Sequence, residues 1–392
     1  MKQFLEGSWA VAEAVKLCKP GVISAYPITP QTHIVEHLAK FVADGRINAE
    51  SINVESEHSA ASVVLGSQAA GVRSFTATSS QGLFLMAEVV FNIAGMRLPI
   101  MMVCANRAIS APINIWNDQQ DSISLRDAGW IQLYAENNQE AIDLIIAGYK
   151  IGEMPKVMLP IMVCVDGFIL THGMETVDMP DAVAVDKFLP AYNPPFKLDV
   201  DNPMSFGLLG DPSVYTENRY SLHKTLEELL EIIPQVGSEY KSAFGRDSVR
   251  LVEKYRVHDA ETVIVALGSV CGTIKDVIDD EREKGNKVGL LKIVTYRPFP
   301  KAAIYNALKN VPNISILDKN ISLGSEGAVY TEVKALFNDS TKKISGFVAG
   351  LGGRDISKGT VIEMLRLTKE EVNNCKFMDL DTSLLWEEFR VS

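Results

Sequence analysis

The stretch that decides the fold is SAYPITPQT, residues 24–32. Residues 22–25, which overlap the beginning of this stretch, are mostly apolar and partly β-branched, and this favours a buried strand. After its second proline an amphipathic pattern indicates a helix over residues 31–43. Two prolines therefore fence off Ile28 and Thr29 at the carboxyl end of a strand, which is where ligands bind in open parallel sheets.

Strand-like and helix-like segments alternate from this stretch to about residue 180. The alternation predicts an α/β fold, a doubly wound parallel sheet covered on both faces by helices. The predicted strands are 22–25, 51–55, 73–78, 99–104 and 157–165, and the predicted helices are 31–43, 57–70, 82–95 and 138–150.

A second, smaller α/β domain is predicted in the last third of the chain. Residues 181–255 break the alternation, first with a surface excursion rich in Pro, Asp and Asn and then with a charged helix over 219–255. The predicted domains are therefore 1–255 and 256–392. In the second domain, the predicted strands are 262–267, 287–294, 313–317 and 344–350, and the predicted helices are 271–284, 301–309, 326–337 and 358–367.

Composition limits the partners that this chain can have. The net charge of −11, with no basic block to offset it, argues against nucleic acids and anionic membranes. The longest apolar run, residues 157–165, is about half of the ~20 residues that a membrane-spanning helix needs. The five cysteines form no CxxC pair, and four of them lie in or beside apolar stretches, which predicts buried, reduced thiols. We expect a cytoplasmic protein without a ferredoxin-type cluster of its own.

The first candidate loop contains Thr29. Thr29 is predicted as the N-cap and Pro30 as the first residue of the helix that follows. A helix N-terminus with a hydroxyl group also favours an anion, so the same loop could seat a carboxylate.

The second candidate loop contains Glu57, at the start of the helix over 57–70. An acid in a first helical turn is ordinary compensation of the helix dipole. Ser59, Ala60 and Ala61, however, are expected to leave the helix surface bare, so that a flat ligand could approach Glu57 closely.

Two further loops complete the set. TATSSQG, residues 76–82, could cap a helix or contact a polar ligand. Arg107 follows the strand 99–104 and opens a long polar loop that runs to Asp121. Arg107 could be an exposed ion-pair partner, or it could clamp a carboxylate together with Thr29.

The remaining motifs are weaker indications of function. His33, His37 and His58 have no metal-ligand partners nearby and are expected to be surface or packing residues, so no metal site is predicted. A glycine-rich segment, residues 350–354, lacks the dinucleotide-binding spacing and is interpreted as a tight turn.

The four loops together resemble a known family. AYPITPQT (25–32), ESEHSAA (55–61), TSSQGL (78–83) and NRAISAPINIWNDQQD (106–121), in this order, resemble the alpha subunit of the multi-subunit pyruvate:ferredoxin oxidoreductases, within the 2-oxoacid:ferredoxin oxidoreductase family. The resemblance extends over the whole chain, through ALGS, TYRPFP and GFVAGLGGRD in the second domain.

The resemblance implies roles for both domains. The first would be the pyrimidine-binding domain of a thiamine diphosphate enzyme, and the second would be similar to the C-terminal domain of transketolases. Glu57 would face the aminopyrimidine of the cofactor, with Pro27 and Ile28 also at the cofactor. Thr29 and Arg107 would hold the substrate carboxylate.

The family's Gly-Asp-Gly motif for Mg²⁺ and diphosphate is missing; the nearest approach, GDPS at 210–213, lacks the second glycine. The resemblance therefore places the diphosphate and Mg²⁺ on a beta subunit. It places the 4Fe–4S clusters on gamma and ferredoxin-like delta subunits, with coenzyme A as co-substrate and ferredoxin as acceptor.

The implied reaction is oxidative decarboxylation of pyruvate with coenzyme A to acetyl-CoA and CO₂. The alternatives are the same chemistry on 2-oxoglutarate, a branched-chain or an aryl 2-oxo acid, or a scaffold subunit without catalysis. Oxalate is disfavoured, because an oxalate enzyme of this group is expected to have Arg in place of Thr29. A nucleotide-binding dehydrogenase is also disfavoured, because Pro27 and Pro30 occupy the turn that its glycine fingerprint needs.

Overall fold

The computed structural model describes residues 2–337, 341–370 and 375–385. The chain divides into two compact units. The first contains Met1–Glu253, Leu267–Ser269 and Ile293–Pro300, and the second contains Lys254–Ala266, Val270–Lys292 and Lys301–Ser392. The functional domain boundary predicted after residue 255 stays a prediction, and the predicted domains include residues outside the described ranges.

A seven-stranded sheet lies at the centre of the first unit, in the order β12-β6-β7-β5-β4-β2-β3. All neighbouring strands of this sheet pair in parallel, apart from β12 and β6, which pair with each other in antiparallel orientation. The predicted parallel α/β sheet is therefore confirmed. The strands are β2 (Val22–Ser24), β3 (Glu50–Ile52), β4 (Ser74–Thr78), β5 (Met101–Asn106), β6 (Ile131–Tyr134), β7 (Ile161–Asp166) and β12 (Thr295–Arg297).

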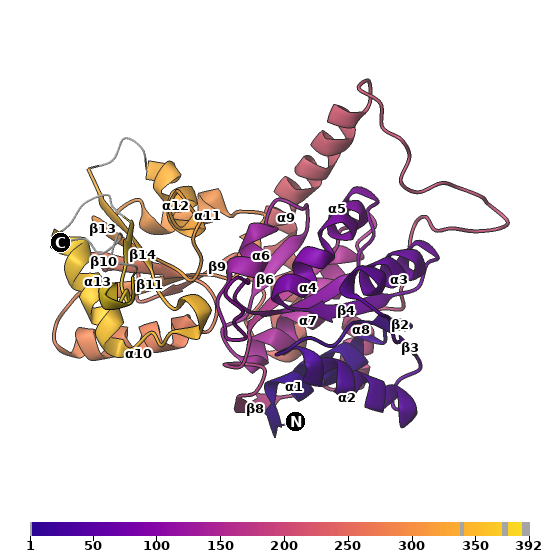
Figure 1. Cartoon of the computed structure of the whole chain (residues 1–392), viewed down its shortest axis with the longest axis horizontal. Coiled ribbons are helices and arrows are strands. Elements are labelled where there is room, and N and C mark those ends of the chain that lie inside the picture. Colours follow the sequence, from indigo (N-terminus) through magenta and orange to yellow (C-terminus); the bar gives the residue numbers. More distant parts are fainter. Residues whose placement is uncertain (1, 338–340, 371–374, 386–392) are drawn as a thin grey trace. The chain divides into compact units, whose positions relative to one another are not determined.

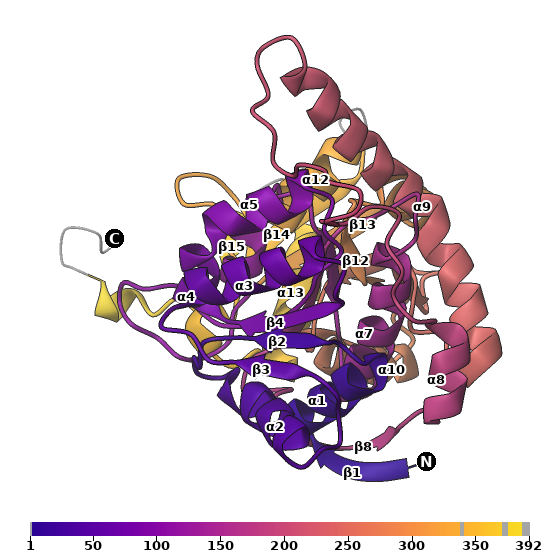
Figure 2. The same cartoon turned by 90° about the vertical axis from the view of Figure 1, so that its right-hand side faces the viewer.

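Helices cover both faces of this sheet, as Figure 2 shows. Strands β4, β5 and β7 are buried along their whole length, which is typical of parallel strands covered on both sides. Helices α3, α4 and α5 lie on one face, and α1 and α2 lie on the other. The bounds are α1 (Gly7–Cys18), α2 (Thr32–Ala43), α3 (Glu57–Ala69), α4 (Ser80–Leu85), α5 (Ala87–Gly95), α6 (Gln120–Ser124), α7 (Asn138–Gly152), α8 (Ala182–Phe188) and α9 (Tyr215–Phe244).

A small antiparallel sheet of β1 (Lys2–Glu6) and β8 (Met174–Asp178) lies beside the main sheet. The predicted surface excursion is also present: residues 193–214 have no helix or strand and run as a long exposed connection into α9 (Figure 1). None of the described helices has the length and apolar character that a membrane crossing requires.

Two predicted helices differ from the structure. The helix predicted over 82–95 is two helices, because α4 ends before Met86 and α5 starts after it. The helix predicted over 219–255 ends at Phe244, since Gly245 takes the left-handed conformation (φ 74°) that terminates a helix. Residues Val252–Tyr255 form a strand, β9, instead.

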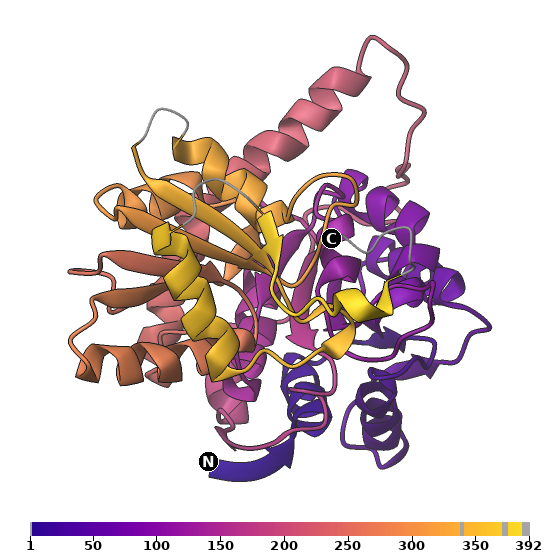
Figure 3. The same cartoon turned by 60° about the vertical axis from the view of Figure 1, so that its left-hand side comes forward.

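The second unit is also α/β, and its sheet has the order β15-β14-β13-β10-β11-β9. Helices cover both faces of this sheet (Figure 3). Successive residues of a strand such as β14 point to opposite faces. Phe347 packs with Val361 of α13, whereas a Cβ at Gly346 would lie 2.6 Å from the Tyr330 ring of α12. The bounds are β10 (Thr262–Ala266), α10 (Val270–Glu283), β11 (Val288–Ile293), α11 (Lys301–Leu308), β13 (Asn313–Asp318), α12 (Ala328–Lys334), β14 (Lys343–Val348), α13 (Lys358–Glu370) and β15 (Cys375–Phe377).

A buried ion pair secures the amino-terminal edge of the first sheet. Arg73 precedes β4, and its Nε and Nη2 donate to Glu153 at 2.6 and 2.7 Å. The same guanidinium donates to the backbone carbonyls of Cys18 and Pro190. Burial raises the pKa of the Glu153 carboxyl, while Arg73 lowers it.

Arg73→Met is expected to lower the free energy of unfolding by ~3–5 kcal/mol, because it leaves a buried carboxylate without its partner. Without Arg73, burial holds the folded-state pKa of Glu153 above the unfolded value, so the loss grows as the pH rises through that pKa. Urea unfolding at pH 5 and pH 7.5 would measure this dependence. Arg366→Met, which removes exposed ion pairs, is the control and should change little.

Candidate active site

The four candidate loops follow four neighbouring strands. They come after β3, β2, β4 and β5, which are adjacent and parallel in the sheet. Because the carboxyl ends of parallel strands share one edge, the loops with Thr29, Glu57, Ser80 and Arg107 lie at the same edge.

The loop after β2 forms a turn before its helix. The Gln31 N–H donates to the Ile28 carbonyl at 2.8 Å, and α2 starts only at Thr32. Thr29 as N-cap and Pro30 as first helical residue are therefore wrong predictions, because this turn occupies both positions. Gln31 is fully buried, and its Nε2 donates to the Ala77 carbonyl at 2.6 Å. The loop is thus fixed to β4.

The outer side of this turn is accessible in the chain. Pro27 and Thr29 are exposed and Ile28 is half-buried, whereas Pro30 is buried. A Cβ at Gly167 would lie 2.5 Å from Pro30 Cγ, so the turn after β7 packs directly against this proline. The buried Pro30 therefore anchors the loop and leaves Ile28 and Thr29 at the surface.

Arg107 lies against the Thr29 loop. Its Nη1 donates to the Thr29 carbonyl at 2.9 Å, and its Nε donates to the Asn114 carbonyl at 2.8 Å. The side chain is buried, which excludes the reading of Arg107 as an exposed ion-pair partner. Burial lowers the pKa of the guanidinium, and the Asp121 carboxylate partly offsets that effect. A guanidinium has five donors, so these two bonds do not use its full capacity.

Asp121 joins two of the loops. Its Oδ2 accepts from the backbone N–H groups of Ser80 and Arg107, both at 3.0 Å. Its Oδ1 accepts from Asn106 Nδ2 and the Ser122 N–H, both at 2.7 Å. The side chain is completely buried, and burial raises the pKa of the carboxyl while these donors lower it. One carboxylate thus sets the spacing of the β4 and β5 loops.

Glu57 is the first residue of α3 and is 7% exposed. Ser56 is the N-cap and accepts from the Ser59 N–H at 3.2 Å. A Cβ at Gly82 would lie 2.7 Å from Glu57 Oε1 and 2.6 Å from Thr78 Oγ1. The Glu57 carboxylate therefore lies at the start of α4, and Gly82 leaves it the room.

The small residues of α3 do not leave a bare surface, contrary to the prediction. Ala60 and Ala61 are completely buried, and Ser59 is half-buried. Helix α3 packs against β2, β4, α4 and α5, so its small side chains allow a close approach to its own domain. The room that the Glu57 carboxylate itself occupies is left by Gly82.

The loop after β4 holds several buried polar atoms. Thr78 Oγ1, Ser79 Oγ and Gln81 Nε2 have no hydrogen-bond partner among the described residues. Gln31 Oε1, on the neighbouring loop, is also without one there. An unsatisfied buried polar group costs ~1–3 kcal/mol, so a polar ligand would stabilise this edge. The donors and acceptors fit a ring that carries nitrogen atoms, as the aminopyrimidine of thiamine diphosphate does.

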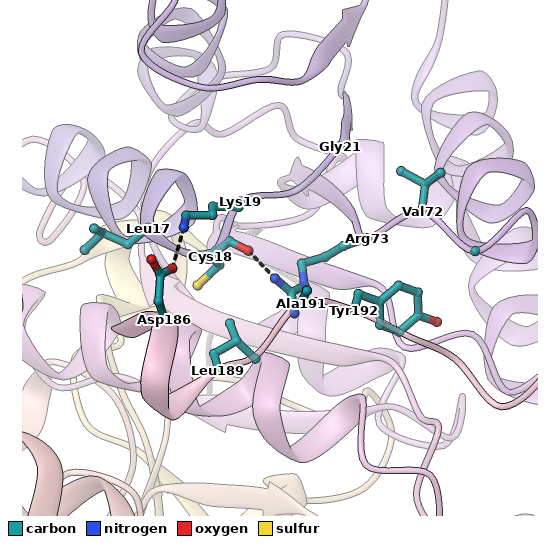
Figure 4. A pocket seen from close by; sticks show the side chains of 11 residues that line it. Leu17, Cys18, Lys19, Gly21, Val72, Arg73, Asp186, Leu189, Ala191 and Tyr192 are labelled. Atoms are coloured by element: carbon teal, nitrogen blue, oxygen red, sulfur yellow. Dashed lines mark hydrogen bonds and ion pairs between the residues drawn. The ribbon is translucent and has the colours of Figure 1, made fainter. Parts of the chain in front are cut away.

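A cavity of about 460 Å³ lies elsewhere, near the amino-terminal ends of β2 and β4 (Figure 4). Its Arg73 is engaged by Glu153, and its Lys19 pairs with Asp186 at the surface. Burial raises the pKa of the Cys18 thiol, so this cysteine is no nucleophile at neutral pH. The cavity contains none of the predicted site residues.

Family profiles match most of the chain. "Pyruvate flavodoxin/ferredoxin oxidoreductase, thiamine diP-bdg" matches residues 13–238, and "Pyruvate:ferredoxin oxidoreductase core domain II" matches residues 260–361. The chain belongs to the pyruvate:ferredoxin oxidoreductase family. The predicted family and its thiamine-diphosphate-binding domain are confirmed, and the chain is an oxidoreductase subunit.

Relatives support the same assignment. A pyruvate synthase subunit PorA from Methanothermobacter thermautotrophicus is 52% identical, covering 96% of this chain and 97% of the relative. The PorA subunit from Pyrococcus furiosus is 48% identical and covers 96% of both chains. A ketoisovalerate oxidoreductase subunit VorA from Pyrococcus horikoshii is 42% identical and covers 98% of both.

Two solved structures share the fold. A 2-oxoglutarate:ferredoxin oxidoreductase from Magnetococcus marinus matches with a TM-score of 0.73 and 18% identity, covering 94% of this chain and 65% of that one. A split-gene transketolase matches with a TM-score of 0.52 and 9% identity, covering 95% of this chain and 100% of that one.

Gly82→Ala tests the space beside Glu57. The added methyl group would contact Glu57 and Thr78, and we expect it to lower the free energy of unfolding by ~1–3 kcal/mol. Gly66→Ala in α3 is the matched control, since a Cβ there meets no atom within 4 Å. It should leave stability unchanged or raise it by ~0.5–1 kcal/mol. Equal effects of both substitutions in thermal or urea unfolding would refute this geometry.

Proposed function

We propose that this chain is the alpha subunit of a complex that oxidatively decarboxylates pyruvate with coenzyme A to acetyl-CoA and CO₂ and reduces ferredoxin. The observation that carries the proposal is the hydrogen bond from Arg107 to the Thr29 loop. Glu57, at the start of α3, lies close by against Gly82 of the β4–α4 junction. The sequence match to pyruvate synthase PorA subunits supports the choice of reaction.

Residues 1–255 would form the pyrimidine-binding domain, and residues 256–392 the domain similar to the transketolase C-terminus. When bound, thiamine diphosphate supplies the carbon nucleophile and the electron sink for cleavage next to a 2-oxo group. Glu57 would hold a proton at the aminopyrimidine ring nitrogen, from a position where it is 7% exposed. Pro27 and Ile28 would pack against the cofactor, since Pro27 is exposed and Ile28 is half-buried in the chain.

Thr29 and Arg107 would bind the substrate carboxylate. Arg107 is a buried cation whose position is set by Asp121 and by the Thr29 carbonyl. A charged donor held in advance binds a carboxylate without the cost of ordering it during the reaction. Thr29, exposed beside it, would donate its hydroxyl to the same carboxylate.

Partner subunits would complete the site. The sequence has no Gly-Asp-Gly motif, so a beta subunit would supply the diphosphate and Mg²⁺ half. The exposed apolar side chains of α4, α5 and the Arg107 loop are suited to such an interface; they are Phe84, Leu85, Phe91, Ile113 and Trp116. Gamma and delta subunits would carry the iron–sulfur clusters, and the complex would act in the cytoplasm without nucleic acid.

Substrate choice is tested on the assembled complex, purified with its clusters and thiamine diphosphate. Reduction of a viologen dye with coenzyme A is compared for pyruvate, 2-oxoglutarate and 2-oxoisovalerate. Pyruvate is expected to react fastest. Preference for 2-oxoisovalerate would instead place the chain with its VorA relatives, and reduction with none of the acids would refute the proposal.

Glu57→Gln is expected to lower the rate of pyruvate-dependent dye reduction by roughly 100- to 10,000-fold, because the amide cannot deliver the proton. Glu55→Gln is the matched control, since Glu55 is exposed two residues away and accepts a hydrogen bond from the Ser59 hydroxyl. It should keep the wild-type rate. If Glu57→Gln also kept full activity in an intact complex, the chain would be a scaffold subunit.

Arg107→Gln is expected to raise the KM for pyruvate by roughly 10- to 100-fold, as loss of a charged donor to a carboxylate costs ~1.5–3 kcal/mol. Arg107→Lys keeps the positive charge but lacks the planar guanidinium, so its KM for pyruvate should lie between those of the wild type and Arg107→Gln. Arg219→Gln, on the exposed face of α9, is the control for loss of one positive charge. An unchanged KM in Arg107→Gln would contradict the clamp.

A further inference from the structure

Three side chains that are far apart in the sequence meet on the first unit. Glu6 ends β1, His33 lies in the first turn of α2, and His172 lies in the turn after β7. One potential ligand atom from each lies within 4.8 Å of the other two. The prediction that His33 has no ligand partners nearby is therefore wrong, because its partners are near in space and not in sequence.

Hydrogen bonds orient this group. Glu6 Oε1 lies 2.8 Å from His33 Nδ1, and the Thr171 hydroxyl lies 2.8 Å from His172 Nδ1. The His33 and His172 rings are 4.8 Å apart between centroids. Two imidazoles and a carboxylate are donors that first-row transition metals prefer.

We propose that Glu6, His33 and His172 form a structural site for a divalent first-row transition metal, with Zn²⁺ as the reference ion. The site uses none of Glu57, Thr29 and Arg107, so it does not rest on the proposed reaction.

The required rearrangement is small. Ligand atoms about 2.0–2.1 Å from a tetrahedral Zn²⁺ lie roughly 3.3–3.4 Å from one another. The side chains of His33 and Glu6 are 44% and 26% exposed, so both can turn without disturbing the core. Rotation of these two side chains toward His172 closes the present spacing, and water can complete the coordination.

A metal at this position would link β1, the start of α2 and the turn after β7, close to the loops that contain Thr29 and Arg107. His33 lies close behind the Thr29 loop, and the turn that carries His172 packs on Pro30 through Gly167. Phe168, in the same turn, lies 4.8 Å from the His172 ring and 6.5 Å from the Trp116 ring of the Arg107 loop. The site would therefore stabilise both loops from outside the catalytic residues.

The test is Zn²⁺ binding to the full-length chain, purified without a histidine tag and stripped with a chelator. Calorimetry should find one Zn²⁺ per chain, and Zn²⁺ should raise the unfolding temperature. His172→Gln and His33→Gln should each weaken binding by more than about tenfold, since even loss of a partner that supports a metal ligand costs that much. His258→Gln, an exposed histidine in the second unit, is the matched control.

Two further measurements keep the proposal falsifiable if a histidine variant folds poorly. Glu6→Gln, a substitution at the surface, should also weaken Zn²⁺ binding. Co²⁺ should give visible absorption bands of a protein-bound ion in the wild type, and these bands should be lost in the variants. Equal Zn²⁺ affinity in wild type and His172→Gln, or an equal loss in His258→Gln, would overturn the proposal, whatever the enzyme activity.

Discussion

The arrangement of the site depends on one buried carboxylate, that of Asp121. One of its oxygens accepts from the backbone N–H groups of Ser80 and Arg107. The other accepts from the side-chain amide of Asn106 and the backbone N–H of Ser122. A buried carboxylate is tolerated only when its oxygens are satisfied, so the loops after β4 and β5 must keep the spacing that satisfies them. This constraint fixes the backbone at Arg107 and at the start of α4, against which the Glu57 carboxylate lies.

The neighbouring strands extend the same constraint across the sheet. Gln31 fixes the Thr29 loop to β4, and Arg107 bonds the carbonyl of Thr29 itself. The loops that carry Thr29 and Arg107 are thereby held at one edge of the sheet by the buried side chains of Gln31 and Asp121. Rigid placement of this kind is what positioning of a cofactor and a charged substrate requires.

Much of this was predictable from local sequence, because alternating apolar runs and loop chemistry are local properties. The parallel sheet and the joint position of Thr29, Glu57 and Arg107 follow from them. The N-cap at Thr29 could not be predicted correctly, since a turn closed by Gln31 competes with the helix. Long-range contacts could not be predicted from local sequence either. In the sequence, Asp121 is one of several polar residues in a loop, and nothing there indicates that it binds two loops. The approach of His172 to His33 is likewise visible only in the fold.

The central claim is that this chain provides the pyrimidine half of a thiamine diphosphate site. It is tested most directly by a structure of the assembled complex with the cofactor bound. We predict the Glu57 carboxylate at hydrogen-bond distance, about 2.6–3.2 Å, from a nitrogen of the aminopyrimidine ring. A pyrimidine bound wholly by another chain, or seated in the cavity beside Arg73, would contradict the account.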